Sequence, residues 1–303
     1  MTEHYPRIRV RAEGGMLLVR EGLSLHFHMR RSHEEVAPSL LRALETYVKA
    51  VGPETLRWYY DPDGEPQPLD EHGWEQARRE LLGPGSPVIQ LDDDSTENRY
   101  RFEYHGKDLK APAVKRKPDA VCSALFWLPT EFLEEHGPER VRELASALAA
   151  PLPLGSGHGG LSFNADYSLL GARHEVAQHW LRYPGFDVYD SPNFHSWKVG
   201  TRVRGPHWLT FLGQPVLGAL GGAEGLRSRL QSPGTTVQEL AGDKVLITLG
   251  AWPEAGDTQQ GDTLPAYREL ARVLEPWLYV DEDPRMLGQS EEDTRRWKRR
   301  FLD

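Results

Sequence analysis

Residues 16–29 read MLLVREGLSLHFHM and are the first strand-forming stretch of the chain. From Leu23 onward apolar and polar residues alternate, a period of two that is typical of a half-buried strand. Glu21 and Gly22 separate two such runs and resemble a turn, so we predict two strands, 16–20 and 23–29, joined as a hairpin. In the second strand His26 and His28 would lie on one face.

Outward from this stretch, helical and extended patterns follow one another irregularly. Helical spacing of apolar residues predicts helices at 32–51, 71–82 and 138–149, and extended runs occur at 87–91, 100–104 and 121–128. Because there is no steady strand–helix–strand rhythm, we predict an α+β fold with mixed, mostly antiparallel sheets and packed helices. The Pro- and Gly-rich residues 150–160 suggest an N-terminal α+β half at 1–150 and a C-terminal α+β half at 151–303. The two halves could be intimately associated or form one continuous domain.

Composition excludes several classes of protein. The chain has 303 residues, of which 39% are hydrophobic and 10% aromatic, so it is not disordered, collagen-like or a coiled coil throughout. The formal net charge of −9 offers no global attraction for nucleic acid or an anionic membrane. No apolar stretch approaches 18 residues and the N-terminus does not resemble a secretory leader, so we expect a cytoplasmic protein. The single cysteine, Cys122, excludes an internal disulfide and is predicted to be buried.

Familiar catalytic motifs are not fulfilled. The segment GSGHGG at 155–160 matches GxGxxG in letters, but no helix pattern follows it, and we interpret it as a glycine loop. His174 and His179 in HEVAQH stand five residues apart, about 140° around a helix, and would not face one zinc ion. There is no GxSxG nucleophile motif. We therefore predict no catalytic residue, no metal ligand and no cofactor, and no enzymatic activity.

Histidines leave one alternative open. His26 and His28 are too few for a metal site unless residues distant in sequence join them. The possible partners of His26 and His28 are His158, His195 and His207. A hydrolase or metal enzyme with a non-obvious site would be built around His158, His174 and His207. Hydrogen-bonded or surface histidines are the simpler interpretation.

Two turn-rich, acidic or aromatic segments are candidates for partner binding. The acidic run DDDSTE at 92–97 lacks the spacing of a calcium loop, and opposite charge would accelerate its encounter with a basic partner. Loops on a rigid scaffold often carry recognition, which also favours residues 183–197. A solvated loop or a packing aromatic remains the alternative for each candidate. The candidate contact residues are Asp92, Asp93, Asp94, Asp187, Tyr189, Asp190 and Trp197.

Several blocks dense in Trp, Gly and Pro occur in a fixed order. They are LFWLPTEFL at 125–133, HGPERV at 136–141, GGLSFN at 159–164, YPGFD at 183–187, GTRVRGPHWLTFL at 200–212, LGAWPEAGD at 249–257 and LPAYRELARVLEP at 264–276. Together they resemble a bacterial immunity family associated with type VI secretion, the TsiV proteins, formerly a domain of unknown function. The resemblance extends from about residue 17 to the RWKRRF ending.

The resemblance implies a function that spacing alone does not show. TsiV proteins are linked to toxins of the VRR-NUC nuclease type. The chain would be an immunity protein that binds and neutralises a cognate type VI secretion toxin, one to one, and the toxin would be encoded by a neighbouring gene. Such inhibition needs no catalytic residue and no cofactor. The alternatives are a structural or assembly component of a secretion or phage-like particle, and the histidine-based enzyme described above.

Overall fold

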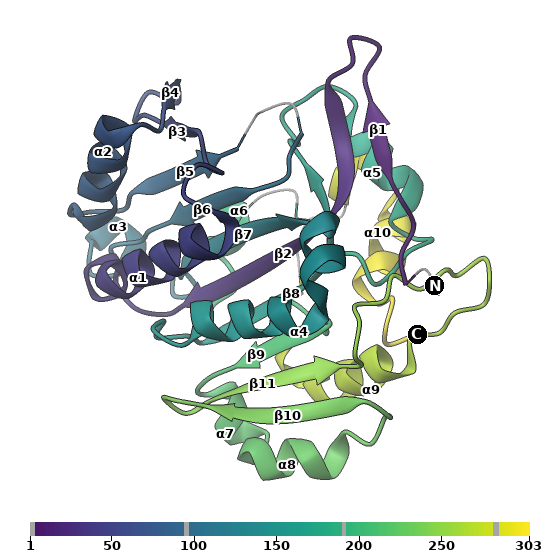
Figure 1. The fold of residues 1–303 in the computed structure, drawn as a ribbon. Coiled ribbons are helices and arrows are strands. Elements are labelled where there is room, and N and C mark those ends of the chain that lie inside the picture. Colours follow the sequence, from purple (N-terminus) through teal and green to yellow (C-terminus); the bar gives the residue numbers. More distant parts are fainter. Residues whose placement is uncertain (1–3, 94–96, 190–191, 281–284) are drawn as a thin grey trace.

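The computed structural model describes residues 4–93, 97–189, 192–280 and 285–303. It confirms the predicted α+β class, because one 11-stranded sheet is flanked by helices (Figure 1). The strand order is β10-β11-β9-β8-β2-β7-β6-β5-β3-β4, with β1 paired to β2, and every ladder is antiparallel.

The elements have the following bounds. The strands are β1 (Arg9–Arg11), β2 (Leu17–Met29), β3 (Trp58–Tyr60), β4 (Pro66–Pro68), β5 (Val88–Asp92), β6 (Arg101–His105), β7 (Cys122–Pro129), β8 (Ser156–Ala165), β9 (Leu209–Leu212), β10 (Thr235–Leu240) and β11 (Lys244–Leu249). The α-helices are α1 (His33–Val51), α2 (Glu71–Leu82), α3 (Pro112–Lys115), α4 (Thr130–Ala149), α5 (Ala172–His179), α6 (Pro192–Ser196), α7 (Val216–Ala219), α8 (Gly222–Arg229), α9 (Pro265–Leu274) and α10 (Glu291–Lys298). Two 3₁₀ turns are η1 (Glu275–Trp277) and η2 (Met286–Gly288).

The hairpin predicted at Glu21 and Gly22 is wrong, because β2 is one continuous strand of 13 residues. Glu21 is fully buried, and its carboxylate accepts hydrogen bonds from the Ile8 backbone at 2.9 Å and from Thr130 Oγ1 at 3.1 Å. A Cβ atom on Gly22 would lie 2.3 Å from Asn164 Nδ2 on β8. The glycine therefore permits a close approach of β8 rather than a turn.

The two faces of β2 differ in chemistry. Leu23, Leu25 and Phe27 point into the main hydrophobic core, which α1, α2 and α4 cover. The alternate residues Ser24, His26 and His28 project from the opposite side, because successive side chains of a strand alternate. We call this second side the polar face of the sheet.

The helices on the apolar side are close to those predicted. α1 matches the predicted helix 32–51, and α4 contains a break at Gly137, whose φ of 78° permits the kink. At the C-terminal end of α4, Lys244 Nζ lies 3.0 Å from each of the carbonyl oxygens of Ala149, Ala150 and Leu152. This buried lysine supplies donors to carbonyls that a helix end leaves unpaired.

One sheet runs through both predicted halves. β2 belongs to residues 1–150 and pairs with β8 of residues 151–303 over ten residue pairs. The division into two halves stays a prediction. No helix in the described part of the chain is long and apolar enough to cross a membrane.

Candidate functional site

A covering segment, residues 186–189 and 192–207, crosses the polar face of β8, β2 and β7. Asp187 forms a bridge to Ser162 on β8, with backbone hydrogen bonds from Asp187 N to Leu161 O and from Phe163 N to Asp187 O. Further along, Ser196 O accepts from Val121 N next to β7. Five histidines are buried between the segment and the sheet, each no more than 3% exposed: His26, His28, His158, His195 and His207.

The histidine cluster is held by hydrogen bonds and ring contacts. His26 Nε2 lies 2.7 Å from Ser123 Oγ and 3.1 Å from the Tyr189 hydroxyl. The rings of His26 and His28 have centroids 4.3 Å apart, because they project from alternate positions of β2. The fold has thus brought residues from β2, β7 and the covering segment into one polar cluster.

Asp187 and Arg204 form the charged part of this cluster. Asp187 Oδ2 lies 3.1 Å from His158 Nε2, and Asp187 Oδ1 lies 3.4 Å from Arg204 Nη2. Burial alone would raise the pKa of Asp187, but Arg204 and His207 hold it well below its usual range. Burial, with the neighbouring His207, lowers the pKa of His158 to about 3. Burial also lowers the pKa of His26 and His28 well below the usual range, so these two histidines and His158 are neutral beside the buried Asp–Arg pair at neutral pH.

Ligand-type atoms of His158, Asp187 and His207 lie within 4.8 Å of one another, the spacing of a possible metal site. The two imidazole rings, however, are stacked with centroids 4.1 Å apart and planes 22° apart. Because imidazole lone pairs lie in the ring plane, nearly parallel rings do not aim at one ion. Arg204 already neutralises the carboxylate, so the arrangement favours a hydrogen-bonded cluster. His174 lies apart from this cluster, exposed on α5.

Ser123 and His26 have the spacing of a nucleophile and its base. Both are buried, at 1% and 0% exposure, and His26 Nδ1 has no hydrogen-bond partner among the described residues. A catalytic base is normally oriented by a third group at that nitrogen. The pair therefore lacks access for a substrate, and His26 lacks a third group that would orient its ring.

The glycine loop predicted at 155–160 is wrong, because these residues belong mostly to β8. A Cβ atom added to Gly157 would lie 2.8 Å from the Phe27 side chain, and one added to Gly159 would lie 2.4 Å from the Leu25 side chain. The glycines permit tight packing against β2, so the GxGxxG letters reflect sheet packing rather than phosphate binding.

A groove of about 460 Å³ opens on the polar face beside the histidine cluster. We call it the polar groove. Tyr189 separates the two features, since its ring lines the groove and its hydroxyl contacts His26. The lining residues are Tyr60, Gln90, Arg101, Glu103, Leu125, Trp127, Ala165, Asp166, Tyr167, Ser168, Arg173 and Tyr189.

Arg101 organises the floor of the polar groove. Its Nε and Nη2 atoms lie 2.6 and 3.1 Å from the two oxygens of Asp92, a two-pronged ion pair. The guanidinium carbon lies 4.4 Å above the Trp127 ring. Beside this pair, burial raises the pKa of Asp93 to about 7.

The sequence-predicted contact residues fall in three places. Asp92 and Asp93 are buried beside the polar groove, and Asp187 and Tyr189 are buried in and next to the histidine cluster. Trp197 is half-buried, with Lys107 Nζ 4.6 Å above its ring. The candidates Asp94 and Asp190 lie outside the described residues. Toxin contact at all of these residues stays a prediction.

Other residues of the groove were not singled out from the sequence. Arg101 and Glu103 alternate along one strand, a polar period of two that could have indicated a wet sheet face. Asp166 follows the end of β8 in sequence, and no local signal pairs it with residues of β3 or β6.

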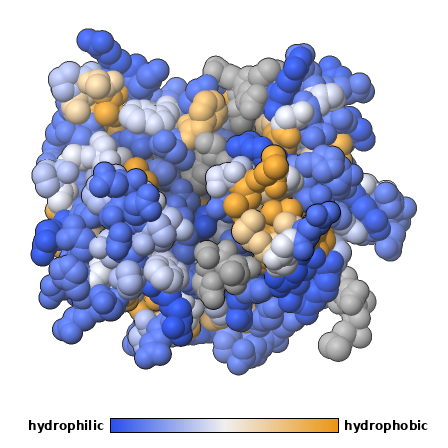
Figure 2. All heavy atoms as spheres, turned by 90° about the horizontal axis from the view of Figure 1, so that it is seen from above, coloured by the Kyte–Doolittle hydropathy of each residue, from blue (hydrophilic) through white to orange (hydrophobic). Residues whose placement is uncertain are grey.

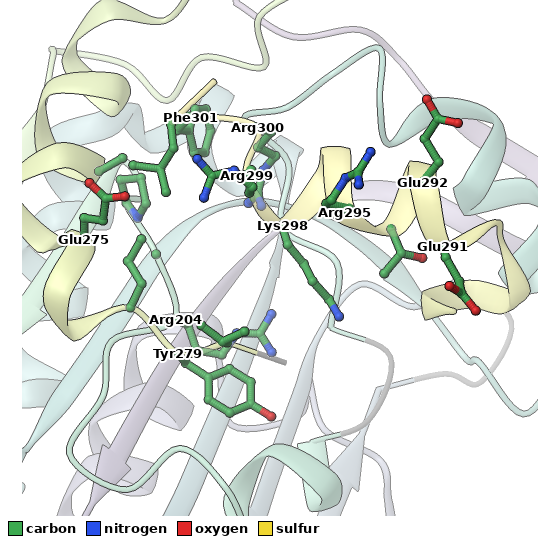
Figure 3. Close-up of a pocket in the computed structure, with 17 residues that line it drawn as sticks. Arg204, Glu275, Tyr279, Glu291, Glu292, Arg295, Lys298, Arg299, Arg300 and Phe301 are labelled. Carbon is green, nitrogen blue, oxygen red and sulfur yellow. The ribbon is translucent and has the colours of Figure 1, made fainter. Parts of the chain in front are cut away.

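A second cavity, of about 680 Å³, lies near the C-terminus (Figure 3). Basic and acidic side chains both line it, including Arg204, Lys298 and Glu291. The basic run 295–300 is largely engaged within the chain. Arg299 pairs with Asp303 at 2.7 Å, and the Arg300 guanidinium lies 3.8 Å above Trp297.

Comparison with known proteins shows that the chain belongs to the class of type VI secretion immunity proteins. The family model TsiV, described as type VI immunity for VRR-NUC, matches residues 39–301, and the chain belongs to this family. A solved structure, the Pseudomonas aeruginosa T6SS protein PA0821, has the same fold with a TM-score of 0.75 and 20% sequence identity. That alignment covers 98% of this chain and 88% of the other. The comparison with curated proteins gave no match.

Proposed function

We propose that this protein neutralises a cognate VRR-NUC-type toxin by binding it directly, one to one, in the cytoplasm. The observation that carries the proposal is the TsiV family match over residues 39–301. Tight inhibition also requires a surface that is ordered before binding, since ordering loops on binding costs free energy. The continuous 11-stranded sheet provides such a scaffold.

The proposed inhibition is not enzymatic. Its support is the burial of the polar cluster, because Ser123, His26 and Asp187 are each no more than 3% exposed. Arg204 is 9% exposed and reaches the surface only where it lines the second cavity. Inhibition by occupying a toxin surface requires shape and charge at the protein surface, and the Ser123–His26 pair contributes neither there.

Charge favours a nuclease as partner. Proteins that bind nucleic acid attract phosphates with basic surfaces. The formal net charge of −9 is opposite in sign, which would steer the two proteins together and compete with the nucleic acid. We propose occlusion of the nucleic-acid-binding surface as the mode of inhibition.

Co-expression with the toxin encoded beside this gene tests the proposal. We expect growth rescue, a co-purified one-to-one complex and suppressed nuclease activity. The Ser123→Ala variant should rescue as well as the unmodified protein, because the hydroxyl has no proposed catalytic role. Rescue without a complex, together with loss of rescue in Ser123→Ala, would contradict the proposal in favour of an enzyme. Stable higher-order assembly without toxin would favour the assembly-component alternative.

A further inference from the structure

Leu170 is the most exposed large hydrophobic side chain in the described part of the chain, at 98%. Single exposed leucines are common and need no explanation by themselves. The position of this one is informative, because residues 166–168 of the same loop form a wall of the polar groove. Seen from above in Figure 2, the surface is mostly hydrophilic, with separate hydrophobic patches.

The loop that carries Leu170 is ordered by its own hydrogen bonds. Asp166 Oδ1 accepts from Ser168 N at 2.9 Å and from Ser168 Oγ at 2.6 Å. The backbone of Ala172 donates to Leu169 O at 3.2 Å, and Gly171 takes a φ of 93°, which disfavours other residues. Little conformational freedom would remain to be lost if Leu170 packed against a partner.

The groove next to Leu170 carries excess negative charge. Among the described residues of the groove and the small cavity beside it, the carboxylates of Asp92, Glu103 and Asp166 outnumber the guanidinium groups of Arg101 and Arg173. Burial raises the pKa of Asp93 to about 7, so this side chain adds only a partial negative charge at neutral pH. Arg101 is committed to Asp92, whereas Asp166 has no ion-pair partner in the described part of the chain. Aromatic rings of Tyr60, Trp127 and Tyr189 line the same groove, and Arg101 and Arg204 already lie over the rings of Trp127 and Tyr189.

We propose that Leu170 and the polar groove form the toxin-docking surface, with Leu170 entering an apolar socket and the groove receiving basic side chains of the toxin's nucleic-acid-binding surface. This inference rests on the proposed toxin binding and assigns it to one surface. An apolar anchor beside complementary charge is the usual composition of a binding hot spot.

A second copy of this chain fits the surface poorly. In a two-fold dimer the same patch faces itself, so the carboxylates of both copies would be placed opposite one another. A basic partner relieves that repulsion. The charge pattern therefore favours the nuclease over self-association.

The test uses the full-length protein and a catalytically inactivated form of the VRR-NUC-type toxin encoded beside the gene. The variants are Leu170→Ser and, as a matched control, Leu82→Ser. Leu82 is a 52% exposed leucine on α2, which packs on the opposite side of the sheet. A third variant, Asp166→Asn, removes one charge while its side-chain oxygen can still accept from Ser168. Unfolding midpoints of all variants are measured first, and should match the unmodified protein.

We expect Leu170→Ser to raise the dissociation constant for the toxin at least tenfold, and Leu82→Ser to change it less than twofold. Asp166→Asn should lower the association rate and reduce its dependence on salt. If the unmodified protein binds and Leu170→Ser binds within twofold of it, this docking surface is wrong while the proposed function stands. If the unmodified protein does not bind the toxin, the proposed function and the docking surface are both wrong.

Discussion

Asp187 Oδ2 lies 3.1 Å from His158 Nε2, and this contact joins the covering segment to strand β8. The same carboxylate faces Arg204, which is 9% exposed. Removing the carboxylate in Asp187→Ala would leave the guanidinium buried without its charge partner. We expect a loss of about 3–5 kcal/mol in the free energy of unfolding, measured by urea denaturation. Asp187→Asn keeps an acceptor and should lose less; equal stability of all three proteins would contradict the role assigned to this pair.

The buried histidines predict sensitivity to acid. Burial lowers the pKa of His26 and His28 well below the ordinary 6.5, and that of His158 to about 3. The unfolded chain therefore binds protons below about pH 6.5 that the folded chain does not. The stability from these groups is present above that pH and is lost as the pH falls. Unfolding free energy should decrease between pH 7 and 5, by up to about 1.4 kcal/mol per pH unit for each group.

His28→Leu tests this origin directly. Neither ring nitrogen of His28 has a hydrogen-bond partner among the described residues, so a leucine removes an unsatisfied polar group and a titrating site. We expect equal or greater stability at pH 7 and a shallower decrease toward pH 5. The control variant is His174→Leu, because His174 is exposed on α5 and lies outside the buried cluster. Identical acid profiles for His28→Leu and the unmodified protein would exclude His28 as a source.

Asp93 predicts the opposite dependence on pH. Burial raises its pKa from 3.8 to about 7, so the folded state resists ionisation. The stability associated with its protonated form is complete below about pH 4 and is lost as the pH rises through 7. Asp93→Asn should therefore be more stable than the unmodified protein at pH 8, by a margin on the order of 3 kcal/mol, and should lose that margin at pH 4. A margin that does not vary with pH would show that Asp93 does not titrate in this range.

Lys244 is predicted to stabilise the end of α4. Its ammonium group donates to three carbonyl oxygens at 3.0 Å, and Lys244→Met keeps the aliphatic stem but removes all three donors. We expect a loss of about 2–3 kcal/mol, because the buried carbonyls would have no replacement donor. Thermal unfolding measures it, with Lys49→Met in the last turn of α1 as a control expected to change little. Equal losses in both variants would argue against a specific cap.

Local sequence patterns predicted the α+β class and several elements. The helical spacing of apolar residues located α1, and the predicted helix 138–149 matches the part of α4 that follows the kink at Gly137. These features depend on neighbours in sequence, which explains why periodicity was sufficient. Family resemblance, carried by blocks spread along the chain, predicted the immunity function that the family match confirms.

The errors arose where distant residues decide local structure. Gly22 resembles a turn residue until Asn164, more than a hundred residues away, is seen to occupy the space of its side chain. The strand register places His26 opposite His158, which alternation within either strand could not reveal. Leu170 was not a candidate, because exposure beside a groove is a property of the assembled fold.

Titration of this protein into a fixed concentration of active toxin, with nuclease activity as the readout, tests the central claim most directly. With toxin well above the dissociation constant, one-to-one inhibition predicts that activity falls linearly and reaches zero at one equivalent. Complete loss of activity at a small fraction of an equivalent would reveal catalytic turnover of the toxin. Unchanged activity at several equivalents would show that this toxin is not inhibited. Either of these results would contradict stoichiometric binding as the basis of immunity.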